Sequence, residues 1–258
     1  MNDADDCRHW GELEVQAGAR AEEDLPHAEG REQIKRALDR AREKLGGEDV
    51  QAHDVPFDPD KWGLDATALP QKALDSGRIS RGDGFAVAAR PADAHANWQL
   101  FCTSFVFGYG TYGVGPARLE RILERTQPAD LCEVIAGARR RLEKCGPLSA
   151  YDYLRGDDIR SKIPYWGPAF FTKLLGFADT PGETGSALIL DNQTAWMVTQ
   201  ISGMEHLIDE RNRSERWTAY RYGVYLAWMT TVSGQLQVRP DFLEYALFLE
   251  AKRRRRRR

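Results

Sequence analysis

The stretch Lys162-Ile-Pro-Tyr-Trp-Gly-Pro-Ala-Phe-Phe-Thr-Lys-Leu-Leu-Gly-Phe177 combines a tight turn with an apolar helix. Pro164 and Gly167 bracket the turn, and Pro168 suits the first helical position, where no backbone N–H is needed. The unpaired N–H groups of a helix start, together with the helix dipole, attract an anion. The segment therefore predicts a hairpin that can hold a phosphate group, although a turn with no binding role fits the same residues.

Lys173 lies in the middle of this apolar helix. An ammonium group that is partly removed from water loses its charge more easily, and the neutral amine is a nucleophile toward an electrophilic sugar carbon. The alternative is a lysine that extends along the helix edge to solvent.

Eighteen residues later, the apolar run Ala187 to Leu190 ends in Asp191, which precedes a helical pattern. Aspartate is well suited to cap a helix. A carboxylate beside a sugar also stabilises the positive charge that develops as a glycosidic bond breaks. The two roles are compatible, so Lys173 and Asp191 are the candidate catalytic pair.

These residues resemble the helix-hairpin-helix DNA glycosylases, whose signature is a Leu-Pro-Gly-x-Gly hairpin, a lysine, and an aspartate about twenty residues on. The segment Ile163 to Pro168 looks like the hairpin, Lys173 would supply the lysine, and Leu190-Asp191 is similar to the family's Val-Asp segment. The resemblance covers roughly Ile79 to Leu249 and points to the bacterial 8-oxoguanine glycosylase group of the OGG fold.

Two positions depart from the family pattern. Tyr165 stands where the usual hairpin has a glycine, and Ala169 occupies the slot that often holds the lysine. Lys173 comes one helical turn later, as in an archaeal branch of oxoguanine glycosylases that carries its lysine deeper in the helix.

The resemblance implies an enzyme that excises a base from double-stranded DNA and leaves an abasic site. The base would be an 8-oxoguanine-like lesion or a hypermodified phage base such as glucosylated hydroxymethylcytosine, and a Schiff base at Lys173 would add lyase activity. The implied DNA-binding residues are Tyr165, Trp166, Gly167, Pro168 and Arg118.

A glycosylase must extrude its target nucleotide into a pocket, usually between aromatic or apolar side chains. Most aromatic residues at helical spacing are core, and we expect only a few of them to touch a base. The candidates are Trp98, Phe105, Phe107, Tyr109, Tyr112, Trp217, Tyr220 and Trp228.

A glycine-rich loop runs from Gly108 to Pro116. A nucleotide-binding loop would need a preceding strand and a different glycine spacing. A tight turn between helices and a close approach to DNA remain as alternatives for this loop.

The periodicity of apolar residues predicts a mostly α, two-lobed fold with a cleft between the lobes. We divide the chain into a flexible acidic leader (1–28), a helix and connector (29–78), a helix-hairpin-helix core (79–250) and a solvated basic tail (251–258). Helical patterns cover 29–45, 94–108, 117–124, 130–145, 149–154, 192–211 and 216–231, and a short strand is possible at 187–190.

With 36 basic and 39 acidic residues the formal net charge is -3, so any nucleic-acid surface must be local. The four cysteines are far apart in sequence and no Cys-x-x-Cys pair exists, which indicates reduced thiols, a cytoplasmic location and no metal cofactor. No signal peptide or membrane span is predicted. We expect a monomer.

Two other classes of protein fit the same residues. A non-catalytic DNA-binding module could use the same hairpin while leaving every base in place. A helical scaffold could bind another protein through its aromatic residues, and the acidic leader fits that alternative.

Overall fold

The computed structural model describes residues 3–256 except 112, 157–160, 180–185, 203, 205–206 and 208–216. In these residues the chain is mostly α, as predicted, with one two-stranded antiparallel sheet in which Val55 pairs with Ile79. The helices are α1 (Asp3–Glu23), α2 (Ala28–Leu45), α3 (Pro59–Trp62), α4 (Gln71–Ser76), α5 (Arg81–Ala88), α6 (Ala94–Tyr109), α7 (Val114–Leu123), α8 (Pro128–Arg155), α9 (Pro168–Ala178), α10 (Asn192–Ser202), α11 (Ala219–Leu236) and α12 (Pro240–Arg255); the strands are β1 (Asp54–Pro56) and β2 (Arg78–Ser80), preceded by the 3-10 turn η1 (Val50–Ala52).

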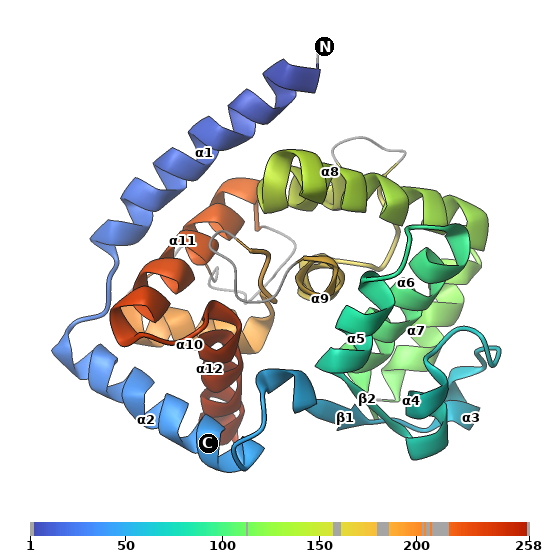
Figure 1. Cartoon of the computed structure of the whole chain (residues 1–258), viewed down its shortest axis with the longest axis horizontal. Helices are drawn as coiled ribbons and strands as arrows, with labels where there is room; N and C mark the ends of the chain where they lie inside the picture. Colours follow the sequence, from blue (N-terminus) through green and yellow to red (C-terminus); the bar gives the residue numbers. More distant parts are fainter. Residues whose placement is uncertain are drawn as a thin grey trace.

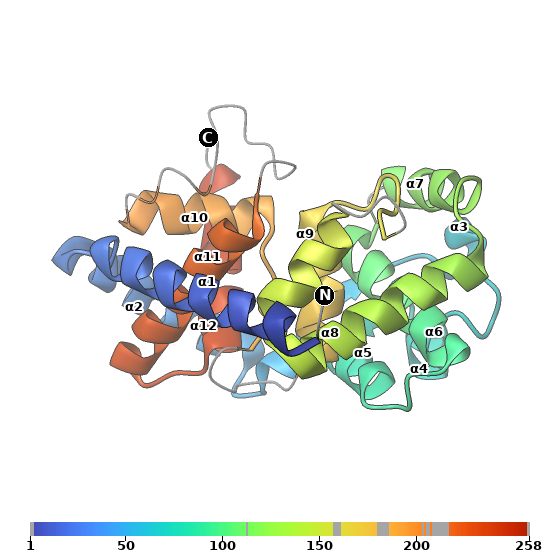
Figure 2. The same cartoon turned by 90° about the horizontal axis from the view of Figure 1, so that it is seen from above.

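The helices gather in two groups (Figure 2). Helices α1, α2, α10, α11 and α12 pack together on one side, and α3 to α7 lie on the other with the small sheet. Helix α9 lies between them and packs on α5, α6 and α8 (Figure 1). The segment that we expected to determine the fold is therefore at its centre.

Local signals in the sequence explain several helix ends. Ser80 and Asp83 form the capping box of α5, in which each side chain bonds the other residue's backbone N–H. Gly46 ends α2 in the left-handed conformation, with φ of 62°. The buried helix predicted over 94–108 is confirmed as α6, which Asp93 caps.

Helix α8 leads into the hairpin. It bends at Gly146, whose φ of 79° is not helical, and Pro147 follows at the bend. After the hairpin, Gly167 precedes α9 and Pro168 occupies its first turn, as predicted. Helices α8 and α9 with the turn between them thus form a helix-hairpin-helix element.

The prediction of a flexible leader over 1–28 is wrong. Residues 3–23 form α1, which packs on α11 and α8. Ala17 of α1 is fully buried. A Cβ built on Gly223 of α11 would lie 3.0 Å from the Cβ of Ala17. Small residues on both helices permit this close approach, and Trp10 and Leu13 of α1 also pack against the core.

The prediction of a solvated tail over 251–258 is also wrong, because α12 continues to Arg255. Glu250 accepts hydrogen bonds from Arg253 and Arg254, which lie three and four residues later on the same face of the helix. These ion pairs offset the repulsion between neighbouring arginines.

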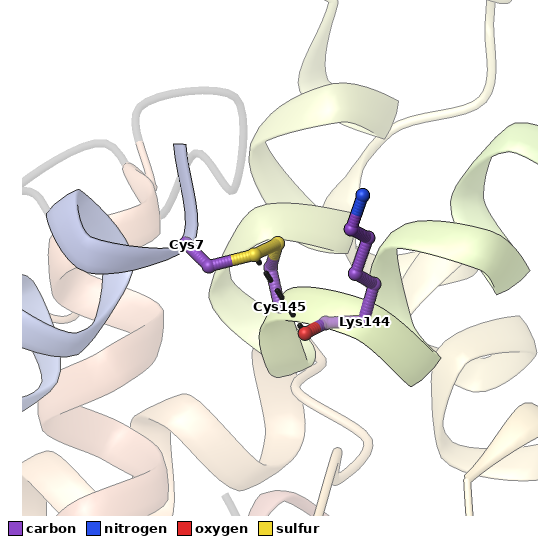
Figure 3. The surroundings of a disulfide bond; sticks show 3 residues. All are labelled: Cys7, Lys144 and Cys145. Atoms are coloured by element: carbon purple, nitrogen blue, oxygen red, sulfur yellow. Dashed lines mark hydrogen bonds between the residues drawn. A yellow bond between two sulfur atoms is a disulfide. The ribbon is translucent and has the colours of Figure 1, made fainter. Parts of the chain in front are cut away.

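The expectation that all cysteines are reduced is wrong for two of them. Cys7 on α1 and Cys145 on α8 form a disulfide (Figure 3), whereas Cys102 and Cys132 are free and buried. The cytoplasmic location stays a prediction, and the cysteines no longer support it. No helix in the described part of the chain has the length and apolar character of a membrane span.

The disulfide generates a prediction about stability. It closes a loop of 138 residues, which restricts the unfolded chain. We expect Cys7→Ser to lower the unfolding free energy by about 3 kcal/mol and the melting temperature by roughly 8 °C. Calorimetry with and without dithiothreitol checks this. The reductant should lower the melting temperature of the wild type to that of the variant and leave the melting temperature of the variant unchanged. Coincident melting curves for the oxidised wild type and the variant would contradict it.

Candidate functional site

The structure brings Lys173 and Asp191 together. Lys173 is 6% exposed on α9, and its Nζ lies 3.7 Å from Oδ2 of Asp191. The same ammonium donates a hydrogen bond of 2.6 Å to the carbonyl of Ala169, one turn earlier. The lysine therefore does not extend to solvent, which excludes the alternative that we considered for it.

Backbone hydrogen bonds to side chains place the aspartate. The hydroxyl of Thr172 donates to the carbonyl of Leu190 and accepts from its N–H, both at 3.1 Å. Because these two residues immediately precede Lys173 and Asp191, this contact aligns the pair. The run 187–190 is extended but forms no strand in the described chain, since side chains take its backbone hydrogen bonds.

Two buried tyrosines hold the other side of this run. Tyr222 accepts from the N–H of Leu188 and donates to its carbonyl, and Tyr225 donates to the carbonyl of Ile189 at 2.8 Å. Buried hydrogen bonds of this kind give a segment a single conformation. Helices α9 and α11 thus fix the approach to Asp191 from both sides.

Asp191 has two roles in the structure, one for each carboxylate oxygen. Its Oδ1 accepts from the N–H groups of Gln193 and Thr194 at 2.9 and 3.0 Å, which caps α10 as predicted. Its Oδ2 faces Lys173. Capping therefore fixes the orientation of the carboxylate toward the amine.

Burial lowers the pKa of Lys173, and the carboxylate of Asp191 opposes that shift. The ring of Phe170 lies 5.6 Å from the ammonium and adds a weak cation–π attraction. The balance favours the neutral amine more than in an exposed lysine, which suits a nucleophile.

The pair opens into a cavity of about 520 Å³, which we call the central cavity. This volume is in the range of small-molecule and cofactor sites. It lies between α9, α6, α12 and β1. The residues that line it are His53, Val55, Pro56, Arg81, Phe107, Gly108, Tyr109, Gly110, Thr111, Lys173, Ile189, Asp191, Gln193, Glu244, Phe248, Lys252, Arg255 and Arg256.

A buried ion pair that sequence reasoning missed forms part of the cavity wall. Arg81 at the start of α5 donates two hydrogen bonds, of 2.6 and 3.1 Å, to Glu244 on α12. The two residues are 4% and 1% exposed, and the pair joins the two groups of helices. Glu244 is a charged residue among apolar residues of a helix, as Lys173 is. This sequence pattern could have identified Glu244 as a candidate.

His53 lies beside this pair and was also missed. Its Nδ1 accepts a hydrogen bond of 3.4 Å from Nε of Arg81. Burial, assisted by the Arg81 guanidinium, lowers the pKa of His53 to about 3, so the ring is neutral at physiological pH. Since Nδ1 accepts, the ring proton is on Nε2, and the imidazole can donate one hydrogen bond from there.

Among the aromatic candidates, Phe107 and Tyr109 line the central cavity. Tyr109 stacks on Phe170, with ring centroids 4.4 Å apart. The other described candidates do not line the central cavity, because they belong to the hydrophobic core or pack against it. They are Trp98, Phe105, Trp217, Tyr220 and Trp228. Tyr112 lies outside the described residues.

The hairpin borders a second hollow of about 480 Å³, the hairpin groove. Tyr165 is 41% exposed there and has φ of 63°, in the left-handed region that favours glycine. It thus adopts the conformation that the family's hairpin glycine provides. Gly167 and Pro168 also line the groove, as does Arg118, which donates a 2.8 Å hydrogen bond to the hydroxyl of Tyr109.

Trp166 lines the hairpin groove, and its contact with DNA stays a prediction. Its side chain is 4% exposed and packs edge-on against Phe101 and Phe171. The left-handed conformation of the preceding residue turns this indole into the core. It anchors the hairpin from inside, and little of the residue is exposed.

The glycine-rich loop serves close packing. Gly108 is still in α6, and a Cβ there would lie 3.0 Å from the ring of Phe170 and 3.3 Å from the side chain of Lys173. Gly110 has φ of 53° and ends the helix. Helix α6 leads directly into the loop, in the place where a nucleotide-binding loop needs a strand.

The second helix of the helix-hairpin-helix element carries a buried lysine, which lies beside an aspartate in a cavity. This arrangement resembles that of the helix-hairpin-helix DNA glycosylases. The model of the family described as "Putative 8-oxoguanine DNA glycosylase OGG-like protein" matches residues 48–248, which is most of the chain. The chain belongs to this family. Comparisons with curated proteins and with solved structures gave no match.

The buried ion pair generates a prediction. Replacing Glu244 by Gln leaves the Arg81 charge buried without its partner, which costs about 3–5 kcal/mol. We expect Glu244→Gln to lower the melting temperature by roughly 10 °C. The double variant Arg81→Met/Glu244→Met, which removes both charges, should recover most of this loss in the same thermal unfolding experiment. A double variant that is less stable than the single one would contradict the assignment.

Proposed function

We propose that this protein is a DNA glycosylase that excises a damaged or modified base from double-stranded DNA and leaves an abasic site. The observation that carries the proposal is the pairing of buried Lys173 with Asp191, 3.7 Å apart, in the central cavity. The family match over 48–248 supports the same chemistry.

In the proposed reaction, the neutral amine of Lys173 attacks C1′ of the extruded nucleotide. The C1′–nitrogen bond to the amine forms as the glycosidic bond breaks, and the base leaves with the electron pair of that bond and takes up a proton. Opening of the sugar ring then gives a Schiff base, from which lyase cleavage of the strand can follow. A water molecule activated by the pair is the alternative nucleophile.

Asp191 acts in two ways in this mechanism. Its carboxylate accepts the proton that the ammonium must lose before attack. Once that proton has passed on to water, the ionised carboxylate also stabilises the positive charge that develops on the sugar in an oxocarbenium-like transition state. The cap on α10 restricts its orientation, so little reorganisation is needed during the reaction.

The proposed DNA path runs from the hairpin groove to the central cavity. The first residues of α9 line the groove, and the positive end of the helix dipole there attracts a backbone phosphate. Arg118 lines the groove and bonds Tyr109, a residue of the cavity wall, so the two sites are adjacent. An 8-oxoguanine-like lesion or a hypermodified base would enter the cavity against Phe107 and Tyr109.

Substitution of the pair tests the chemistry. Lys173→Gln and Asp191→Asn should each lower the rate of base release by at least about 100-fold, because each removes a group that acts at the reacting carbon. Asparagine still caps a helix, so Asp191→Asn should keep the fold. Mass spectrometry of bases released from oxidatively damaged DNA and from glucosylated phage DNA measures the rate and identifies the base.

Matched controls exist for both substitutions. Asp93 caps α6 with the same geometry, and Lys72 is exposed on α4; Asp93→Asn and Lys72→Gln should release base at the wild-type rate. Release that persists in Lys173→Gln would refute the role of the lysine. Salt-dependent DNA binding without release by the wild type would favour the non-catalytic DNA-binding module, and no such binding would favour the protein-interaction scaffold.

The pKa of Lys173 generates a pH prediction. Only the neutral amine attacks, so single-turnover borohydride trapping should rise with pH through a pKa below the usual lysine value of about 10.4. The carboxylates of Asp191 and Glu244 raise this pKa and the Arg81 guanidinium lowers it. Asp191→Asn should therefore shift the pH at which trapping rises to a lower value, and should also reduce the maximum amount trapped. If trapping by the wild type rises with a pKa at or above the usual lysine value, the neutral-amine mechanism is contradicted. Complete absence of trapping would indicate that water is the nucleophile.

A further inference from the structure

The basic residues at the end of α12 divide into two sets on different faces of the helix. Arg253 and Arg254 follow Glu250 by three and four residues and bond its buried carboxylate at 2.6 and 2.8 Å. Burial alone would raise the pKa of Glu250, but its hydrogen bonds to the two arginines lower it to about 2. The protein itself therefore neutralises part of this charge.

Lys252, Arg255 and Arg256 form the second set, again related by three and four residues. All three line the central cavity. Within the described part of the chain, none of them pairs with a carboxylate. Three positive charges are thus left uncompensated where the cavity opens.

Arg255 is held close to the candidate catalytic carboxylate. Its guanidinium lies 5.2 Å from the ring centroid of Trp196 and donates a 3.4 Å hydrogen bond to the carbonyl of Asn192, the residue after Asp191. Lys252 lies over the ring of Phe248 at 5.1 Å. These contacts restrict the two side chains and keep much of their hydrogen-bonding capacity available.

An uncompensated cationic set of this kind suits a phosphate group, which guanidinium binds through paired hydrogen bonds. A nucleotide extruded into the central cavity carries backbone phosphates on both sides of its sugar. When that sugar reaches Lys173 and Asp191, a flanking phosphate must lie near the opening. We propose that Lys252, Arg255 and Arg256 form a clamp for this DNA backbone phosphate, an inference that rests on the proposed glycosylase function.

The clamp is separate from the properties that come with the family. The family match ends at residue 248, so all three residues lie beyond it. It is also separate from the hairpin groove, whose lining contains none of the three. The strand would then be held at two places, one on each side of the lysine–aspartate pair.

Two double variants with the same change in charge test the clamp. Lys252→Gln/Arg255→Gln removes two clamp charges, and Arg253→Gln/Arg254→Gln removes the two charges that pair with Glu250. The probe is duplex DNA with a reduced abasic-site analogue, which binds without turnover. Fluorescence anisotropy over a range of salt concentrations gives the affinity, and thermal unfolding reports on the fold.

We expect the clamp variant to bind about tenfold or more weakly, with the slope of log affinity against log salt shallower by about 2 and the melting temperature unchanged. The matched variant should melt at a lower temperature and keep its affinity within about twofold. Equal weakening in both variants would overturn the clamp, because general charge would then explain it. Inorganic phosphate should displace DNA from the wild type more strongly than chloride at equal ionic strength, and the clamp variant should lose this difference; equal displacement by the two anions would overturn a phosphate site.

The clamp and the glycosylase proposal can fail separately. Wild-type affinity in the clamp variant, with base release intact, would refute the clamp alone. Salt-dependent binding that the clamp variant loses, in a protein that releases no base, would support the clamp and refute the glycosylase. A wild type that does not bind DNA would refute both.

Discussion

The buried ion pair between Arg81 and Glu244 is the interaction on which the geometry of the site depends. It joins α5 to α12 and therefore connects the two groups of helices across the central cavity. A buried pair adds little net stability over well-packed apolar residues, but losing one partner is costly. The pair also acts beyond packing: its Arg81 guanidinium assists burial in lowering the pKa of His53, and both of its charges act on the pKa of Lys173.

Two opposing effects act on the pKa of Lys173. Removal from water favours the neutral amine, and the nearby carboxylate favours the ammonium. Neither effect arises from the helix that carries Lys173. They require α9 to be covered by α5, α6 and α8, and they require a segment that is held by Thr172 and two tyrosines to place Asp191.

The charge distribution explains how a chain with net charge -3 can present a surface for a polyanion. The hairpin offers backbone N–H groups and a partly exposed tyrosine, which need little formal charge. The end of α12 offers three cations that no carboxylate in the described chain neutralises. Attraction is therefore concentrated around the cavity, where local fields act most strongly.

Local sequence patterns determined much of this protein. Turn residues, caps and helical periodicity located α2, α6 and α9, and the spacing of a lysine and an aspartate around an apolar run identified the candidate pair. The helices were accessible because caps, turns and periodicity depend on neighbours within a few residues. Only the tertiary structure decided that α1 is ordered through small residues packed on α11, that Trp166 turns inward, and that Cys7 meets Cys145. It also decided the cavity wall, because Arg81 and Glu244 are 163 residues apart and their pairing depends on how distant helices pack.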